Sequence, residues 1–160
     1  MADVFRIGYG SDFHRLLPGR KLVLGGVEIP SDRGAVAHSD GDALLHAIMD
    51  ALLGAAALGD IGEHFPDTDP KYAGASSAQM ARTVAEMVSG KWEIGNVDAV
   101  VFLERPKLLA HRERMRAGIA QALGIDVGRV SVKAKTMEAT GPVGNRDAVA
   151  AEAVAALFPK

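Results

Sequence analysis

Asp12 and His14 stand two residues apart at the end of a short apolar segment, within the stretch YGSDFHR. In an extended chain alternate side chains point to the same side, so these two residues would face one way and Phe13 the other. A carboxylate and an imidazole that share a side are suitable ligands for a divalent metal ion. The pair also fits an ordinary strand end, so the spacing alone leaves both interpretations open.

A second candidate ligand, His46, lies in the segment AHSDGDALLH, near the start of a predicted helix. Together with Asp12 and His14 it would give one carboxylate and two imidazoles, a set that zinc accepts while one coordination position stays open. Asp42 and Asp50 lie four residues to either side of His46 on one helical stripe, where a carboxylate would fix the histidine tautomer. The alternative is a polar histidine at a helix edge beside a solvated acidic face.

Three other segments carry polar residues at positions suited to a phosphorylated ligand. The loop GDIGEHFPDTDP combines carboxylates for sugar hydroxyls with glycine N–H groups for phosphate, or else is an acidic turn with helix caps. In ERPKLLAH, Lys107 either neutralises a phosphate or is an exposed lysine in a first helical turn. In KAKTMEATG, Thr136 and Glu138 follow a strand and suit a magnesium–diphosphate complex, because hard cations prefer oxygen ligands.

Composition excludes several classes of protein. The chain has 160 residues and no cysteine, so disulfides and thiolate metal sites are excluded, and its net charge of −2 gives no indication of a basic nucleic-acid surface. The start, MADVFRIGYG, lacks the features of a signal peptide, and the apolar stretches are too short to cross a bilayer. We therefore expect a cytoplasmic protein with no membrane or nucleic-acid partner. The GYG of this start lacks the third glycine and following helix of a dinucleotide fingerprint, and no Walker A or esterase serine motif occurs.

The elements that must position these side chains alternate between strand and helix, which predicts one α/β domain over residues 1–160. Helical periodicity and capping residues predict a helix from Asp40 or Asp42 to Gly59. The other predicted helices cover residues 76–88, 107–123 and the Ala-rich segment 147–158. The predicted strands cover residues 4–9, 97–104 and 129–136, with a hairpin over 21–30 and loops over 60–74 and 137–146.

Taken together, four segments resemble the 2-C-methyl-D-erythritol 2,4-cyclodiphosphate synthases of the non-mevalonate isoprenoid pathway, and the resemblance extends nearly from end to end. The segments are RIGYGSDFH, AHSDGDALLHAIMDALLGAAALGDIGEHFPDTDP, ERPKLLAH and VKAKTMEATG. The resemblance implies a small α/β subunit of the α+β sandwich type, with a mixed sheet and helices. It also implies a homotrimer whose active sites lie between subunits.

The resemblance further implies the roles of individual residues. Zinc or manganese would bind Asp12, His14 and His46, and magnesium would bind Glu138. Lys107 and Thr136 would act on the phosphates, with Asp42 and Asp50 behind the metal ligands. The positions that match substrate contacts are His38, Ser39, Asp60, Ile61, Gly62, Phe65, Pro66, Asp67, Thr68, Asp69, Pro106, Leu108, Leu109, Ala134 and Lys135.

The implied reaction is an intramolecular phosphoryl transfer in 4-diphosphocytidyl-2-C-methyl-D-erythritol 2-phosphate, which releases CMP and needs no nucleophilic side chain. The alternatives are a zinc phosphoesterase with a linear product and a non-enzymatic nucleotide- or metal-binding module. The C-terminal segment departs from the family pattern: Pro142 stands where phenylalanine is common, and Asn145 stands at the usual arginine, one place before Arg146. These departures leave open whether the trimer axis binds an isoprenoid diphosphate, as it does in some members. Ser11 also replaces a common phenylalanine.

Overall fold

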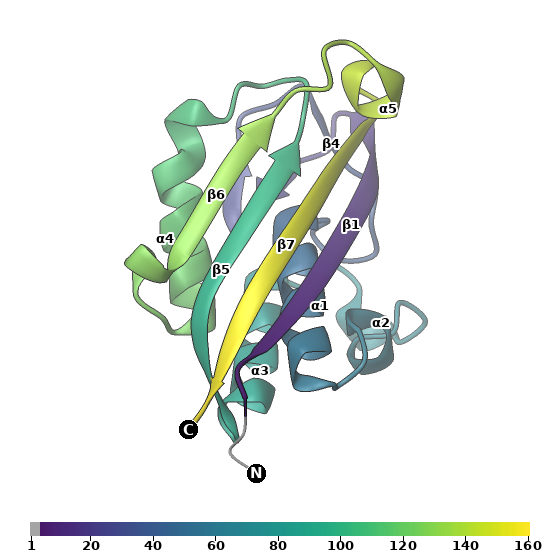
Figure 1. Cartoon of the computed structure of the whole chain (residues 1–160). Helices are drawn as coiled ribbons and strands as arrows, with labels where there is room; N and C mark the ends of the chain where they lie inside the picture. The colour runs from purple at the N-terminus through teal and green to yellow at the C-terminus, as the bar shows by residue number, and fades with distance from the viewer. Residues whose placement is uncertain (1–3) are drawn as a thin grey trace.

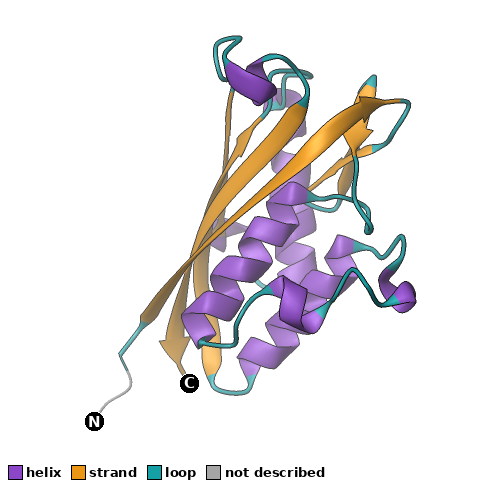
Figure 2. Ribbon diagram, turned by 90° about the vertical axis from the view of Figure 1, so that its right-hand side faces the viewer, coloured by secondary structure: helices purple, strands orange, loops and turns teal. Residues whose placement is uncertain are grey.

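The computed structural model describes residues 4–160, which form a sheet with helices against one of its faces (Figures 1 and 2). The strands are β1 (Arg6–Pro18), β2 (Leu22–Leu24), β3 (Val27–Ile29), β4 (Arg33–Ala35), β5 (Trp92–Phe102), β6 (Val130–Lys135) and β7 (Ala148–Pro159). The α-helices are α1 (Ala43–Ala56), α2 (Ile61–His64), α3 (Ser77–Ser89), α4 (Arg112–Leu123) and α5 (Gly141–Gly144). Single 3₁₀ turns are η1 (Pro70–Tyr72), η2 (Leu109–His111) and η3 (Val127–Arg129).

The main sheet has five strands in the order β4-β1-β7-β5-β6, and β2 and β3 form a separate hairpin. Strands β5 and β6 are parallel, whereas β1 pairs antiparallel with β4 and β7, and β7 pairs antiparallel with β5. The predicted mixed sheet and its helices are thus confirmed. None of the helices in the described part of the chain combines the length and hydrophobicity that a membrane span requires.

Helix α1 is the centre of the core and begins where the sequence predicts. The side chain of Asp42 accepts a hydrogen bond from the backbone N–H of Leu45 and so caps the first turn. The helix is buried along nearly its whole length. It ends at Ala57, which adopts the left-handed conformation with φ 58°, so the predicted end at Gly59 is two residues late.

Helix α1 lies unusually close to β1, and glycine makes this approach possible. A Cβ atom built on Gly8 would stand 1.9 Å from the carbonyl oxygen of Ala51, and one on Gly10 would stand 2.1 Å from that of Ala47. No side chain fits in such a space. The GYG of the sequence therefore lets a helix backbone rest directly on a strand.

The prediction of a helix over residues 147–158 is wrong, because this segment is β7, the central strand of the sheet. Alanine favours helices in isolation, but here burial alternates along the strand, with Ala151, Ala153 and Ala155 buried and Glu152 and Val154 exposed. Pairing with strands on both sides overrides the intrinsic preference of these residues.

Smaller differences concern the ends of elements. Strand β1 continues through His14 to Pro18, and β5 already begins at Trp92. Helix α4 begins at Arg112, after the turn η2, and not at Lys107. The loop predicted over 60–74 contains α2 and η1, and the one over 137–146 contains α5.

Candidate metal and substrate site

Asp12 and His14 lie on the face of β1 that α1 covers, on the same side as Gly8 and Gly10, and Phe13 faces the opposite way with 57% exposure. The predicted alternation is therefore confirmed. Where α1 packs against β1, the side chain of His46 on α1 contacts both Asp12 and His14. The Oδ2 atom of Asp12 lies 2.8 Å from Nε2 of His14 and 3.0 Å from Nδ1 of His46, and the two nitrogens are 3.2 Å apart.

These three atoms have the spacing of a metal site. Bonds of 2.0–2.1 Å to a tetrahedral zinc ion separate its ligands by about 3.3 Å, only slightly more than the distances between these atoms. Asp12, His14 and His46 are also the group in the described chain whose ligand atoms converge closely enough to hold an ion. A divalent ion would fit after the side chains separate by a few tenths of an ångström.

The electrostatics of the cluster favour a charged carboxylate. Burial acts to raise the pKa of Asp12, but hydrogen bonds from His14 and His46 outweigh it and hold that pKa well below its usual range. Burial acts to lower the pKa of His46, but hydrogen bonding and charge from Asp12 outweigh this effect and raise it. The carboxylate of Asp12 thus stabilises a positive charge on the imidazole of His46. A bound metal ion would supply positive charge at the same place.

The predictions for Asp42 and Asp50 are wrong, because neither carboxylate is bonded to the ring of His46. The oxygens of Asp42 accept from the backbone N–H groups of Gly25, Gly26 and Leu45, so this residue holds the β2–β3 turn against the start of α1. Burial raises the pKa of Asp42 to about 6, although these three N–H groups act in the opposite direction. Asp50 accepts from the N–H of Ile61 at 2.8 Å and holds the start of α2.

The second ring nitrogen of His46 instead contacts two serines. Its Nε2 lies 2.9 Å from Oγ of Ser77, at the start of α3, and 3.4 Å from Oγ of Ser39. The hydroxyl of Ser77 donates in turn to Asp40, and the backbone N–H of Ser77 donates to the same carboxylate at 2.9 Å. Ser77 is not among the predicted partners of His46, because residues 40, 46 and 77 show no common spacing in the sequence.

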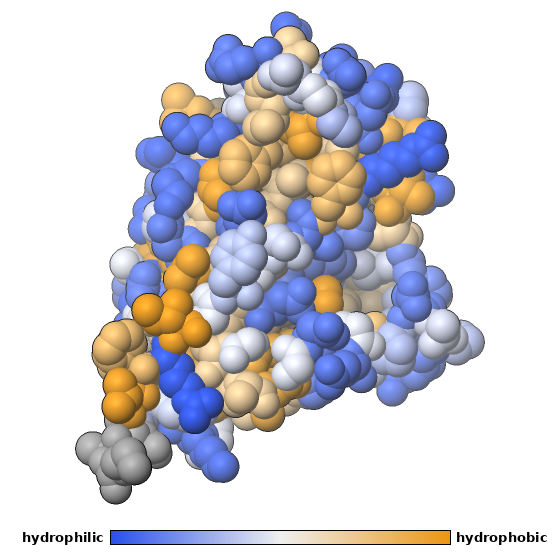
Figure 3. Space-filling model, turned by 45° about the vertical axis from the view of Figure 1, so that its right-hand side comes forward, coloured by the Kyte–Doolittle hydropathy of each residue, from blue (hydrophilic) through white to orange (hydrophobic). Residues whose placement is uncertain are grey.

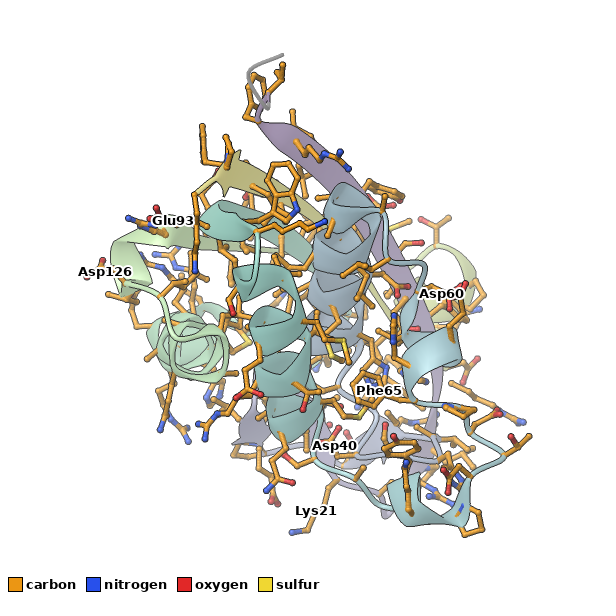
Figure 4. All side chains as sticks on the ribbon, turned by 90° about the horizontal axis from the view of Figure 1, so that it is seen from below. Lys21, Asp40, Asp60, Phe65, Glu93 and Asp126 are labelled. Carbon is orange, nitrogen blue, oxygen red and sulfur yellow. The ribbon has the colours of Figure 1, made fainter. Side chains whose placement is uncertain are left out.

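A cavity of about 460 Å³ opens beside the candidate metal ligands. Its lining contains seven of the predicted substrate contacts, namely His38, Ser39, Ile61, Gly62, Phe65, Pro66 and Asp67, and also Ala37, Tyr72 and Met80. Phe65, which lines this cavity, directly follows α2 and is labelled in Figure 4.

Three of the residues predicted in this loop do not line the cavity. Asp60 caps α2 through the N–H of Glu63, Asp69 caps η1 through the N–H of Lys71, and Thr68 is exposed. Asp60 and Asp69 therefore agree with the alternative interpretation of this loop, an acidic turn whose carboxylates cap helices.

A second, smaller cavity of about 210 Å³ gathers the residues predicted to bind cytidine and phosphate. Its lining is Leu103, Lys107, Leu108, Leu109, Arg112, Ala134, Lys135 and Thr136. Pro106 is not part of this lining, whereas Leu103 and Arg112 belong to it although the sequence did not predict them. The hydroxyl of Thr136 donates at 3.1 Å to Oε1 of Glu138, an exposed residue outside this lining.

The two cavities share no residue and are built on strands that are not neighbours in the sheet. The first is built on β1 and the second on the end of β6, with β7 and β5 between them. Three steps between neighbouring strands amount to about 14 Å. One chain therefore presents two half-sites and not one continuous cleft.

The fold and the site define a small α/β protein with a candidate divalent-metal site beside a cavity of ligand size. The model of the YgbB family matches residues 5–158. A relative from Cupriavidus metallidurans, named 2-C-methyl-D-erythritol 2,4-cyclodiphosphate synthase, is 54% identical over 154 residues, 96% of this chain and 92% of the relative. The chain therefore belongs to the YgbB family.

Solved structures agree in fold. The bifunctional IspDF of Campylobacter jejuni superposes with a TM-score of 0.94 at 39% identity; the match covers 98% of this chain but 43% of that longer protein. A 2C-methyl-D-erythritol-2,4-cyclodiphosphate synthase in a CDP-bound form gives a TM-score of 0.87 at 42% identity and covers 96% of this chain and all of that one. The fold and family implied by the sequence motifs are thus confirmed.

Proposed function

We propose that this chain converts 4-diphosphocytidyl-2-C-methyl-D-erythritol 2-phosphate to 2-C-methyl-D-erythritol 2,4-cyclodiphosphate and CMP, in the non-mevalonate isoprenoid pathway. The observation that carries the proposal is the convergence of Asp12, His14 and His46 at the wall of a ligand-sized cavity. The names of relatives more than half identical to the chain, over nearly its full length, support the same activity.

The reaction joins two phosphates of one molecule. An oxygen of the 2-phosphate forms a bond to the β-phosphorus, the bond from that phosphorus to the oxygen bridging to the α-phosphate breaks, and CMP leaves with this oxygen and its electron pair. Both partners are anions, so the protein has to hold them in line and offset their repulsion. No nucleophilic side chain is needed, which agrees with a chain that contains no cysteine.

We infer that Asp12, His14 and His46 hold zinc or manganese, and that Glu138 holds magnesium together with the diphosphate. Bound divalent ions supply positive charge to the phosphates and polarise the phosphorus that is attacked. His38 and Ser39, on the wall of the first cavity, would bind the methylerythritol phosphate.

The second cavity provides the remaining contacts. Lys107 would neutralise a phosphate, and the hydroxyl of Thr136 would donate a hydrogen bond to a phosphate oxygen as charge develops. The apolar side chains of Leu103 and Leu108, both nearly fully buried, would form a wall for the cytosine ring.

We further propose that the chain assembles as a homotrimer in which one subunit's metal half-site faces the nucleotide half-site of its neighbour. The sheet face opposite the helices supports this proposal, because it exposes large apolar side chains. These are Ile7, Tyr9, Phe13, Val154 and Phe158, between 42% and 63% exposed. Figure 3 shows orange, hydrophobic side chains gathered at the lower left of the molecule. Exposed apolar area of this kind is typical of a protein–protein interface.

The purified chain, incubated with the diphosphocytidyl substrate and a divalent cation, tests the proposal. Phosphorus NMR should show the cyclic diphosphate, and chromatography should show one CMP released for each cyclic product. Linear phosphates would instead indicate a metal-dependent phosphoesterase, and the absence of turnover would indicate a binding module. Light scattering of the same sample should give the mass of three chains.

A further inference from the structure

The side of His46 that faces away from Asp12 and His14 is held by a chain of hydrogen bonds that ends on a carboxylate. Ser77 is fully buried, and its Oγ lies 2.9 Å from Nε2 of His46. The same hydroxyl contacts Oδ1 of Asp40, whose Oδ2 accepts the backbone N–H of Ser77 at 2.9 Å. Figure 4 shows Asp40 at the end of α3 where Ser77 begins the helix.

The direction of each hydrogen bond follows from the chemistry of the groups. An ionised carboxylate can only accept, so the single proton of the Ser77 hydroxyl is donated to Asp40. The serine oxygen then has only lone pairs left for His46, and the ring must donate from Nε2. In the metal-free chain the carboxylate of Asp12 also accepts from Nδ1 at 3.0 Å, so a metal ion would take the place of the proton on this nitrogen. Once that proton has left, a ring whose Nε2 still donates to Ser77 has its lone pair on Nδ1, the atom that faces Asp12 and His14.

Asp40 is itself fixed in position. Its backbone N–H donates to the carbonyl oxygen of Ala75 at 3.1 Å, and the N–H of Gly74 donates to the carbonyl oxygen of His38 at 2.7 Å. These two bonds join the loop before α1 to the segment before α3. The carboxylate therefore lies on a braced loop, and it can hold Ser77 and the ring behind it in one orientation.

We propose that Asp40 and Ser77 are positioning residues that set the tautomer and the orientation of His46, so that Nδ1 is presented to a divalent ion. The inference rests on the proposed function, since it assigns this role at the proposed metal site. Ser39 lies farther from the same nitrogen, at 3.4 Å, and its Oγ also accepts from the N–H of Gly41. Ser77 is therefore the principal acceptor of the ring proton.

Two measurements on the full chain test this proposal without relying on turnover. In the first, metal-free protein labelled with ¹⁵N is examined by long-range ¹H–¹⁵N NMR, which distinguishes a proton on Nε2 from one on Nδ1. In the wild type, Nε2 of His46 should carry a proton that exchanges slowly with water, whatever the state of Nδ1 beside Asp12, and this proton should exchange faster in Ser77→Ala and Asp40→Asn. The hydroxyl and the N–H of Ser77 bond to different oxygens of Asp40, and asparagine replaces one of these oxygens by an NH₂ donor, so one bond is lost.

In the second measurement, Zn²⁺ affinity is determined by competition with a chromophoric chelator, and the Co²⁺ absorption spectrum reports the coordination geometry. Ser77→Ala should lose about 10- to 100-fold in affinity, the usual effect of removing a partner behind a metal ligand. The matched control is Ser76→Ala, at the neighbouring position, where the side chain caps nothing and affinity should not change.

The outcomes separate this inference from the proposed function. An Nε2 that carries no proton in the wild type, or wild-type Zn²⁺ affinity in Ser77→Ala, would overturn the positioning role. A wild-type chain that binds metal but forms no cyclic product would overturn the proposed function and leave the positioning role standing. If the wild type bound no metal, the proposed function would fail, and the exchange rate of the Nε2 proton in the metal-free protein would still decide whether Ser77 and Asp40 hold the ring of His46.

Discussion

Replacement of Gly10 by alanine should damage the fold and the candidate metal site together. The added methyl group would lie 2.1 Å from the carbonyl oxygen of Ala47, whereas ordinary contact begins near 3.4 Å. Strand β1 and helix α1 must then separate by roughly 1.3 Å. Overpacking of this kind typically costs about 1–3 kcal/mol of the free energy of unfolding.

The same separation acts on metal binding, because β1 carries Asp12 and His14 while α1 carries His46. Metal–ligand distances tolerate only about 0.2 Å, and a misplacement of 1 Å can reduce catalysis by about 100-fold. We therefore expect Gly10→Ala to lose at least tenfold in Zn²⁺ affinity and more in turnover, in addition to its loss of stability.

Gly54→Ala is the matched control, since it makes the same change within α1. There the nearest atom to an added Cβ is the carbonyl oxygen of Tyr9, at 3.9 Å. This variant should keep its metal affinity and be as stable as the wild type, or up to about 1 kcal/mol more stable, because alanine favours the helix. Urea unfolding and chelator competition measure both quantities. Unchanged stability and affinity in Gly10→Ala would refute the argument that the glycines set the spacing of the site.

Three further outcomes are expected. His46→Ala should lose tight metal binding and nearly all turnover while its circular dichroism is retained; survival of both would show that the ligand assignment is wrong. Lys107→Ala should raise KM about 10- to 100-fold, as expected for a charged hydrogen bond to phosphate, with little change in Tm; an unfolded variant would instead indicate a structural lysine. Although burial lowers it, the pKa of His46 is raised by Asp12 in the metal-free chain. Zn²⁺ affinity should therefore increase with pH until this pKa is passed, and over the same range the metal-free protein should lose the stability that protonated His46 contributes. A flat pH profile of affinity would contradict this.

The candidate ligands could be predicted from the sequence because their arrangement depends mainly on local geometry. Asp12 and His14 share a face through the alternation of a strand, and His46 follows a recognisable helix start at Asp42. The contact between β1 and α1 is a tertiary contact, which the spacing of residues within either element cannot predict. The chemistry of the three side chains suggested it, the resemblance of whole segments to a known family implied it, and the distances between ligand atoms now support it.

The partners behind His46 could not be predicted in the same way. Helical spacing placed Asp42 and Asp50 on the stripe of His46, yet each carboxylate is bonded to backbone N–H groups elsewhere. An unpaired N–H at a turn or helix start competes for any nearby carboxylate, and periodicity carries no information about such groups. The residue that does contact the ring, Ser77, comes from a helix that begins 31 residues later.

The alanines of β7, which made this strand resemble a helix, have a physical role in the site. Ala151 and Ala153 lie on the buried face of the sheet, and Ala151 pairs with Asp12 in the register of β1 and β7. Larger side chains here would hold α1 away from the sheet, as a side chain at Gly10 would. Small residues on two adjacent strands thus let one helix approach until His46 reaches Asp12. The composition that misled the helix prediction is therefore a requirement of the close packing on which the proposed metal site depends.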